Sequence, residues 1–322
     1  MSKKLLLPLI VVLSIVLSAC GANKANNGSS AAENASPSAS PAASEPAASE
    51  PAAAGTITYQ SELGPIEVPA NPQRIVALSS APNVISLGGT VVGVDEWTEK
   101  SPHFKDKLSG VAVVSEDKLE DIIALEPDLI IAGSYNKNLD KMKEIAPTVV
   151  YTWGKLDYLA QQLEIGKLLN KEQEAQAWID DFKKRAAEAG AEIKAKIGED
   201  ATISVLETDS KSFYVFGNNW ARGTEILYQA MGLNMPEKVK ADALGPGYYQ
   251  LSNEVVADYA GDYIVLSRSG TGDNSFMETD AWKNIPAVKN NHVIEIDTEA
   301  STYSDPTTLE YLLNIFKEGF LK

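Results

Sequence analysis

Cysteine and histidine are nearly absent from this chain of 322 residues. Cys20 is the only cysteine, and His103 and His292 are the only histidines. A single thiol forms no internal disulfide, and protein-built zinc or manganese sites usually draw on more His and Cys than this. We therefore expect no disulfides and no metal bound directly by the protein.

Several catalytic and nucleotide-binding signatures are also missing. The chain has no Walker motif, no dinucleotide fingerprint and no Gly-x-Ser-x-Gly, since Leu266-Ser-Arg-Ser-Gly270 lacks the first glycine. We expect a protein that is not an enzyme and has no intrinsic cofactor. A hydrolase whose triad is dispersed in the sequence, for example one that processes siderophores, stays open as an alternative.

Basic residues and long apolar runs are scarce. The chain has 28 Lys and Arg against 44 Asp and Glu. Without Lys3 and Lys4, which precede Cys20, 26 basic residues remain and the net charge is near −18. This acidity argues against nucleic acid as a partner and against a basic membrane-binding patch. The longest apolar run, Leu5 to Leu17, is 13 residues and too short to span a bilayer.

The N-terminus has the order of a secretory signal: two lysines, an apolar run, then small residues. Leu17-Ser-Ala-Cys20 resembles a bacterial lipobox, which implies that Cys20 is lipid-modified and becomes the mature N-terminus. A plain signal peptide or a short membrane anchor is the alternative. Residues 21–55 are almost entirely Ala, Ser, Pro, Gly, Asn and Glu and predict a disordered tether of about 30–35 Å. We expect a folded part held at the outer face of the cell membrane by lipid alone.

Short apolar segments alternate with helical patterns from Arg74 onward. We predict strands at 74–78, 91–94, 129–132 and 148–151, and helices at 82–89, 119–125 and 139–145. This alternation favours an α/β domain with a largely parallel sheet.

The pattern then turns helical for about 40 residues. A helix at 156–169 is followed by an apolar stripe from Ala175 to Ile193 at three- and four-residue spacing, with Asn170 as the expected N-cap. Strands resume at 202–206, 213–216, 263–266 and 293–296, with helices near 223–231, 253–259 and 306–319. The interpretation is two α/β lobes, residues 56–156 and 199–322, joined by a helical connection at 157–198. One continuous domain with a helical insertion is the alternative.

Two segments repeat at an offset of 134 residues, Leu119 to Ile131 and Asn253 to Val265. Glu120 pairs with Glu254 and Asp128 with Asp262, and each segment predicts a helix, a breaker, an aspartate and a buried strand. The repeat supports two lobes of the same build. Each glutamate is expected in the first turn of its helix, where it favours the helix dipole or serves a pseudo-symmetric partner.

Together these residues resemble the ferric-siderophore and cobalamin type of solute-binding protein of ABC importers, which also includes haem binders. The resemblance covers about residues 56–320. It rests on Asn71 to Leu78, Leu119 to Ile131, Ile145 to Val149, Gln162 to Asn170 and Trp220 to Leu233.

The resemblance implies two rigid lobes, a long connecting helix and a shallow cleft. It implies that Glu120 and Glu254 dock on arginines of the importer's permease, which works with a separate ATPase. We expect a monomer that captures a ferric siderophore outside the cell and delivers it to the permease. Haem or cobalamin as the ligand, and a sensory or adhesive lipoprotein with the same body, are the alternatives.

The resemblance places the ligand among loops that follow strands, where aromatic walls and a few cations suit a bulky iron chelate. Arg222 is the leading candidate, because it follows Trp220 and opens the predicted helix at Gly223. Lys137 is a weaker candidate, and His103 is the residue that would serve haem. His292 begins a strand and is expected to be structural. The remaining candidates are Arg268, Trp97, Lys100, Tyr135, Trp153, Trp220, Tyr248, Tyr249 and Tyr303. This set predicts a mildly cationic, aromatic cleft.

Overall fold

The computed structural model describes residues 55–208 and 212–322. Cys20 and the tether predicted for residues 21–55, apart from Gly55, lie outside the described residues. In the part of the chain that is described, no helix has the length and apolar character needed to cross a membrane.

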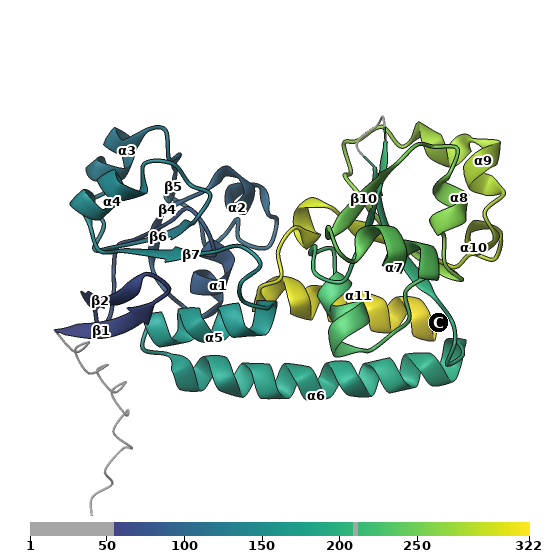
Figure 1. The fold of residues 1–322 in the computed structure, drawn as a ribbon, viewed down its shortest axis with the longest axis horizontal. Helices are drawn as coiled ribbons and strands as arrows, with labels where there is room; N and C mark the ends of the chain where they lie inside the picture. Colours follow the sequence, from purple (N-terminus) through teal and green to yellow (C-terminus); the bar gives the residue numbers. More distant parts are fainter. Residues whose placement is uncertain (1–54, 209–211) are drawn as a thin grey trace, which may run out of the picture. The chain divides into compact units, whose positions relative to one another are not determined.

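The N-terminal lobe contains a five-stranded sheet in which every neighbouring pair is parallel. The strand order is β5–β4–β3–β6–β7 (Figure 1). The bounds are β3 Ile75–Ala77, β4 Val91–Val94, β5 Ala112–Val113, β6 Leu129–Gly133 and β7 Thr148–Tyr151. All five residues of β6 are buried, as expected for a central strand covered on both faces.

Helices cover both faces of this sheet. Ile75, Leu129 and Val149 pack against α1 (Ala81–Ser86) and α5 (Tyr158–Leu168) on one face. The alternate residues Val76 and Ile130 pack against α3 (Leu119–Ala124) and α4 (Leu139–Ile145) on the other. The lobe also contains α2 (Glu96–Lys100) and an N-terminal hairpin of β1 (Thr56–Ser61) and β2 (Gly64–Pro69).

The C-terminal lobe repeats this strand order as β10–β9–β8–β11–β12. The bounds are β8 Ile203–Thr208, β9 Phe213–Phe216, β10 Tyr248–Leu251, β11 Tyr263–Arg268 and β12 Val293–Asp297. Strands β8, β11 and β12 are parallel, whereas β9 is antiparallel to both β8 and β10. The predicted fold of two lobes with largely parallel sheets is therefore confirmed, with a mixed sheet in the second lobe.

Helices again occupy both faces. On one face lie α6 (Glu172–Ile197), a π-helical segment η1 (Glu225–Ala230) and α11 (Pro306–Leu321). On the other lie α7 (Glu237–Ala243), α8 (Val256–Tyr259), α9 (Asp280–Lys283) and α10 (Pro286–Lys289). Short 3-10 turns are η2 (Ser275–Glu278) and η3 (Glu299–Ser301).

Helix α6 links the lobes, and it contacts both α5 and α11 (Figure 1). Its predicted apolar stripe is buried, with Phe182 and Ile193 in the core of the C-terminal lobe. Gly190 allows η1 to approach closely, because a Cβ there would lie 2.2 Å from the carbonyl oxygen of Met231. The prediction that Asn170 caps α6 is wrong: Asn170 has a left-handed φ of +56°, and Lys171 is the N-cap residue.

The repeated aspartates make equivalent hydrogen bonds in the two lobes. Asp128 accepts hydrogen bonds from the backbone N–H groups of Gln73 (2.7 Å) and Arg74 (2.9 Å), just before β3. Asp262 accepts from the backbone N–H and the hydroxyl of Thr202, both at 2.8 Å, just before β8. Asp128 thus fixes the start of β3, and Asp262 fixes the start of β8, as an internal repeat predicts.

Candidate functional site

The carboxyl ends of the parallel strands carry most of the predicted site residues, the position where α/β sheets bind ligands. Trp97 and Lys100 lie in α2 after β4, Tyr135 follows β6, and Trp153 follows β7. Trp97, Tyr135 and Trp153 expose more than 60% of their surface. Large exposed aromatic rings at one edge of a sheet suit contact with a ligand.

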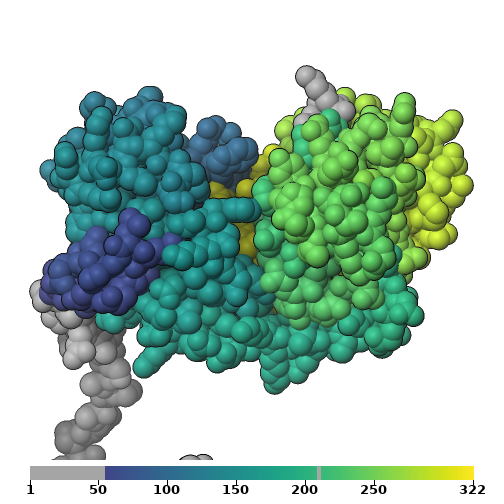
Figure 2. All heavy atoms as spheres, viewed as in Figure 1, coloured from purple at the N-terminus to yellow at the C-terminus, as the bar shows by residue number. Residues whose placement is uncertain are grey.

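An aromatic cluster joins the two lobes. The ring of Trp153 lies 5.1 Å from that of Trp220, which lies 4.8 Å from that of Tyr248. Tyr249 is also exposed and stacks on Tyr259 at 5.8 Å. Figure 2 shows the surface hollowed between the blue and teal residues of the N-terminal lobe and the green residues of the C-terminal lobe. Trp153, Trp220 and Tyr248 form the aromatic cluster of the candidate site.

The loop that carries Trp220 has an unusual backbone. Ala221, Arg222 and Gly223 have φ values of +56°, +54° and +78°. Left-handed non-glycine residues cost free energy and tend to persist at functional sites. Gly247 is needed beside this loop, because a Cβ there would lie 2.4 Å from the Trp220 ring.

A buried carboxyl group holds this strained loop. Glu225, which is 5% exposed, accepts hydrogen bonds from Ala221 N–H (3.0 Å) and from the Thr224 hydroxyl (3.1 Å). Arg222 N–H donates to Ser301 O at 2.8 Å. Burial raises the pKa of Glu225 above the ordinary 4.5, although these hydrogen bonds oppose the shift.

The raised pKa of Glu225 predicts a pH dependence of stability. Because the folded protein holds this proton more tightly than the unfolded chain, Glu225 favours folding at low pH. That contribution is lost as the pH rises above about 4.5 towards the folded-state pKa. We expect Glu225→Gln to remove this loss, so that the variant gains stability relative to the wild type between pH 4.5 and 7.5. Urea unfolding across this range measures it, and parallel curves would contradict the assignment.

Arg222 is paired with a carboxylate in the same lobe. Its Nε and Nη2 atoms donate to Glu207 Oε2 (2.7 Å) and Oε1 (3.0 Å). Both side chains are largely buried, at 17% and 16% exposure. The guanidinium lies 5.5 Å from the ring centre of Phe216. Arg222, in the loop that carries Trp220, is therefore one half of a neutral ion pair.

The other predicted cations are paired as well. Lys100 binds Glu96 at 2.5 Å, and Lys137 lies 3.7 Å from Asp117. Each cation predicted for the cleft therefore has an acidic partner close by, and the mildly cationic, aromatic cleft stays a prediction. Sequence order alone did not reveal these pairs.

Arg268 lies apart from Arg222. It donates to Glu295 on the neighbouring strand at 2.7 Å. Side chains alternate along a strand, and Ser267 donates to Glu207 at 2.7 Å, so Arg268 belongs to the opposite face of the sheet from the Arg222 pair. The alternation of side chains along this predicted strand could have shown from the sequence that Ser267 and Arg268 lie on opposite faces. We therefore leave Arg268 out of the proposed site.

Tyr303 and His103 connect the lobes. The Tyr303 hydroxyl lies 3.1 Å from Asp95 Oδ1 and 3.1 Å from Thr98 Oγ1. His103 Nε2 lies 2.9 Å from Ala300 O, so this nitrogen is already engaged. These contacts place both residues at the lobe junction. His292 stacks on Tyr263 at 4.1 Å, in keeping with its expected structural role.

The hairpin β1–β2 supports the loop that carries Trp153. Glu62, with 12% of its side chain exposed, accepts a hydrogen bond from Thr152 N–H (3.2 Å) and binds Lys155 Nζ (3.1 Å). Burial alone would raise the pKa of Glu62, but the bonds to Thr152 and Lys155 outweigh it and lower the pKa. Sequence reasoning missed this residue, because its partners lie about 90 positions away.

We expect Glu62→Ala to weaken ligand binding by releasing the Trp153 loop. The expected loss is about 1 kcal/mol, roughly fivefold in Kd, the scale of one hydrogen bond. A double-mutant cycle with Trp153→Ala measures it: the cost of Glu62→Ala should vanish once Trp153 is gone. Glu67→Ala, on the same hairpin but bonded to Thr58, is the matched control. An equal loss with and without Trp153 would contradict a role through this loop.

The comparison with known proteins decides the family. Residues 75–300 match the model of the periplasmic binding protein family. The iron(3+)-hydroxamate-binding proteins FhuD and YxeB of Bacillus subtilis strain 168 are 35% and 33% identical to this chain. The alignments cover 97% and 99% of this chain and 96% of each relative. The chain belongs to the periplasmic binding protein family.

A solved structure of another family member agrees with this assignment. FhuD2 of Staphylococcus aureus with bound ferrioxamine B is 36% identical, with a TM-score of 0.74, over 78% of this chain and 98% of that one. The predicted resemblance to siderophore-type solute-binding proteins is confirmed.

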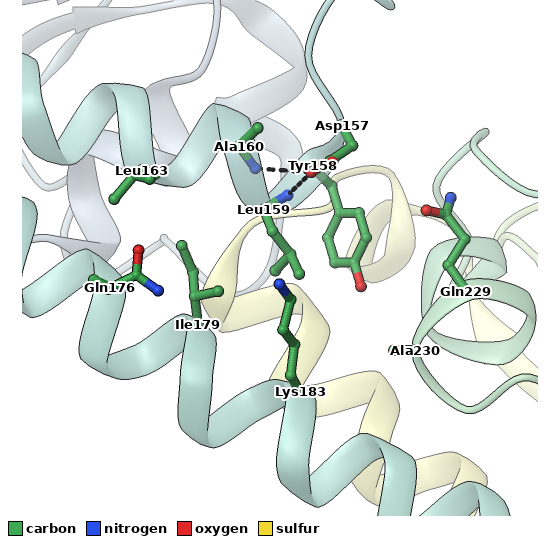
Figure 3. A pocket seen from close by; sticks show the side chains of 10 residues that line it. All are labelled: Asp157, Tyr158, Leu159, Ala160, Leu163, Gln176, Ile179, Lys183, Gln229 and Ala230. Atoms are coloured by element: carbon green, nitrogen blue, oxygen red, sulfur yellow. Dashed lines mark hydrogen bonds between the residues drawn. The ribbon is translucent and has the colours of Figure 1, made fainter. Parts of the chain in front are cut away.

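Two cavities of this periplasmic binding protein are lined by residues outside the aromatic cluster. One, of about 540 Å³, lies between α5, α6 and η1, and Tyr158, Lys183 and Gln229 line it (Figure 3). The other, of about 680 Å³, lies between the end of α6 and the residues around Asp262 and His292. Neither contains a predicted ligand-binding residue.

The predicted docking glutamates are exposed in equivalent parts of the two lobes. Glu120 lies in the first turn of α3, which precedes β6. Glu254 lies in the turn before α8, which precedes β11. The prediction that Glu254 lies within its helix is therefore wrong, because Val255 N–H bonds back to Ser252 O and the helix begins at Val256. Within residues 55–208 and 212–322, neither glutamate forms an ion pair.

Proposed function

We propose that this chain captures a ferric hydroxamate siderophore and delivers it to the permease of an ABC importer. The family consists of substrate-binding proteins, and the names of FhuD and YxeB specify iron–hydroxamate binding.

The observation that carries the siderophore class is the pairing of Arg222 with Glu207. Three hydroxamate groups balance the charge of one iron(III) ion, so the chelate core is neutral, whereas three catecholate groups leave it strongly anionic. A chelate without net negative charge needs no unpaired cation. The Arg222–Glu207 pair suits such a ligand.

Arg222 has N–H groups that the ion pair with Glu207 does not use. A guanidinium carries five N–H bonds, and the pair with Glu207 uses two of them. We infer that the remaining N–H groups donate to iron-bound hydroxamate oxygens. Trp153, Trp220 and Tyr248 would then contact the aliphatic parts of the chelate, because aromatic rings provide large apolar faces.

Transport requires a membrane anchor and a partner. Cys20 would carry the lipid that holds the protein at the outer face of the membrane. We propose that Glu120 and Glu254 contact the permease, through which the chain works with the ATPase. The protein would act as a monomer, and the iron would enter as cargo inside its chelate.

The test is a tryptophan-fluorescence titration of the chain without residues 1–20. This variant retains all the described core residues, which lie between Tyr59 and Phe320. The probes are a ferric trihydroxamate, a ferric tris-catecholate, ferric citrate, haem and cobalamin. Submicromolar quenching by the trihydroxamate supports the proposal. Quenching by haem or cobalamin alone would show that the ligand is not a siderophore. No quenching by any of the probes would refute capture of these ligands.

A further inference from the structure

The carboxylate of Glu207 is held in place from two sides. Arg222 donates to both of its oxygens, and Ser267 Oγ donates to Oε2 at 2.7 Å. Ser267 Oγ in turn lies 2.9 Å from Thr298 Oγ1. Glu207 therefore has a fixed position, set by β8, β11 and the segment that follows β12.

Arg222 is equally constrained. Its backbone N–H donates to Ser301 O at 2.8 Å, and its guanidinium packs over Phe216. The backbone and the guanidinium of Arg222 are both held, so Glu207 and Arg222 form a preorganised pair. A ligand that contacts Arg222 therefore also meets the field of the Glu207 carboxylate.

The Arg222–Glu207 pair can donate hydrogen bonds to a ligand although the pair as a whole has no net charge. The N–H groups of Arg222 that Glu207 does not use would donate to a neutral chelate at little electrostatic cost. An anionic chelate, by contrast, gains from the Arg222 charge and loses to the Glu207 charge. Both side chains are more than 80% buried, so water screens these opposing terms weakly.

We propose that Glu207 is a specificity-determining residue that keeps the site closed to iron chelates of net negative charge. The inference rests on the proposed function, because it concerns the same site. It goes further by assigning the rejection of anionic chelates to one carboxylate rather than to the shape of the cleft.

The test compares Glu207→Gln with the wild type, both as the chain without residues 1–20. Glutamine keeps the size of the side chain and one carbonyl acceptor but removes the negative charge. The probes are ferrichrome, a neutral ferric trihydroxamate, and a ferric tris-catecholate. We expect Glu207→Gln to bind the tris-catecholate at least about tenfold more tightly than the wild type does, because the Arg222 charge is no longer offset. The ratio of its Kd for the tris-catecholate to its Kd for ferrichrome should therefore fall at least about tenfold below the wild-type ratio, and this ratio is the readout of specificity.

Two variants serve as controls. Glu295→Gln makes the same charge change beside Arg268, on the opposite face of the sheet, and should leave both Kd values within about twofold. Ser267→Ala loosens Glu207 while keeping its charge, so it should not admit the tris-catecholate. Where Glu207→Gln folds poorly, the wild type still tests the proposal, because it should bind ferrichrome more tightly than the tris-catecholate.

Several results would overturn the proposal. One is a Glu207→Gln protein that binds the tris-catecholate no better than the wild type. Another is an equal gain in affinity for the tris-catecholate in a control variant. A gain in Glu295→Gln would point to the net charge of the protein, and a gain in Ser267→Ala would point to loosening of the Glu207 side chain. A wild type that binds the tris-catecholate as tightly as ferrichrome would also refute it. A folded wild type that binds neither chelate would instead refute the proposed function.

Discussion

Arg222→Ala should weaken binding of a ferric trihydroxamate by about 1.5–3 kcal/mol, roughly 10- to 150-fold in Kd. The variant removes the charged donors that we place against the iron-bound oxygens. The backbone conformation gives no additional reason for the loss, because alanine tolerates φ of +54° about as well as arginine does. Fluorescence titration measures the Kd, and near-UV circular dichroism checks that Trp220 keeps its environment.

Two further variants separate ligand contact from damage to the fold. Arg268→Ala also deletes an ion-paired arginine from this lobe, but on the other face of the sheet, so its Kd should match that of the wild type. Arg222→Lys keeps the charge but loses the planar fork, and it should bind nearly as poorly as the alanine variant. An unchanged Kd for Arg222→Ala would remove this residue from the site.

The repeat was the most informative feature of the sequence for the fold. It predicted two lobes of one build, and the sheets indeed share their strand order. The antiparallel direction of β9 was not predicted, because Phe213 to Phe216 is a mostly buried run of aromatic residues and valine, and such a run does not indicate the direction of a strand. The start of α6 was also misassigned, because asparagine favours both N-caps and left-handed positions after a helix.

The site was harder to predict than the fold. Aromatic residues that follow strands were identifiable, and Trp153, Trp220 and Tyr248 do lie together. The charge of the site was not, because it depends on which carboxylate lies beside each cation. Arg222 and Glu207 are 15 positions apart and come together only when the loop after β9 folds back over β8.

The double variant Glu120→Ala/Glu254→Ala should abolish uptake of the iron chelate by cells while leaving its Kd unchanged. Both glutamates are exposed, lie in equivalent parts of the two repeats and form no ion pair within the described residues. Carboxylates left free in this way are available to a partner's cations, and truncating a charged contact with a partner costs several kcal/mol. Losing two such contacts should reduce docking by more than a hundredfold.

Uptake of radioactive iron measures transport, and fluorescence titration of the same variants measures the Kd. The control is Asp121→Ala/Asp258→Ala, which removes two acidic residues from α3 and α8 and should transport normally. A single change at Glu120 or Glu254 should leave partial uptake, because the other lobe still docks. Normal uptake by the double variant would show that these carboxylates do not hold the permease, and the repeat would then be explained by strand placement through Asp128 and Asp262 alone.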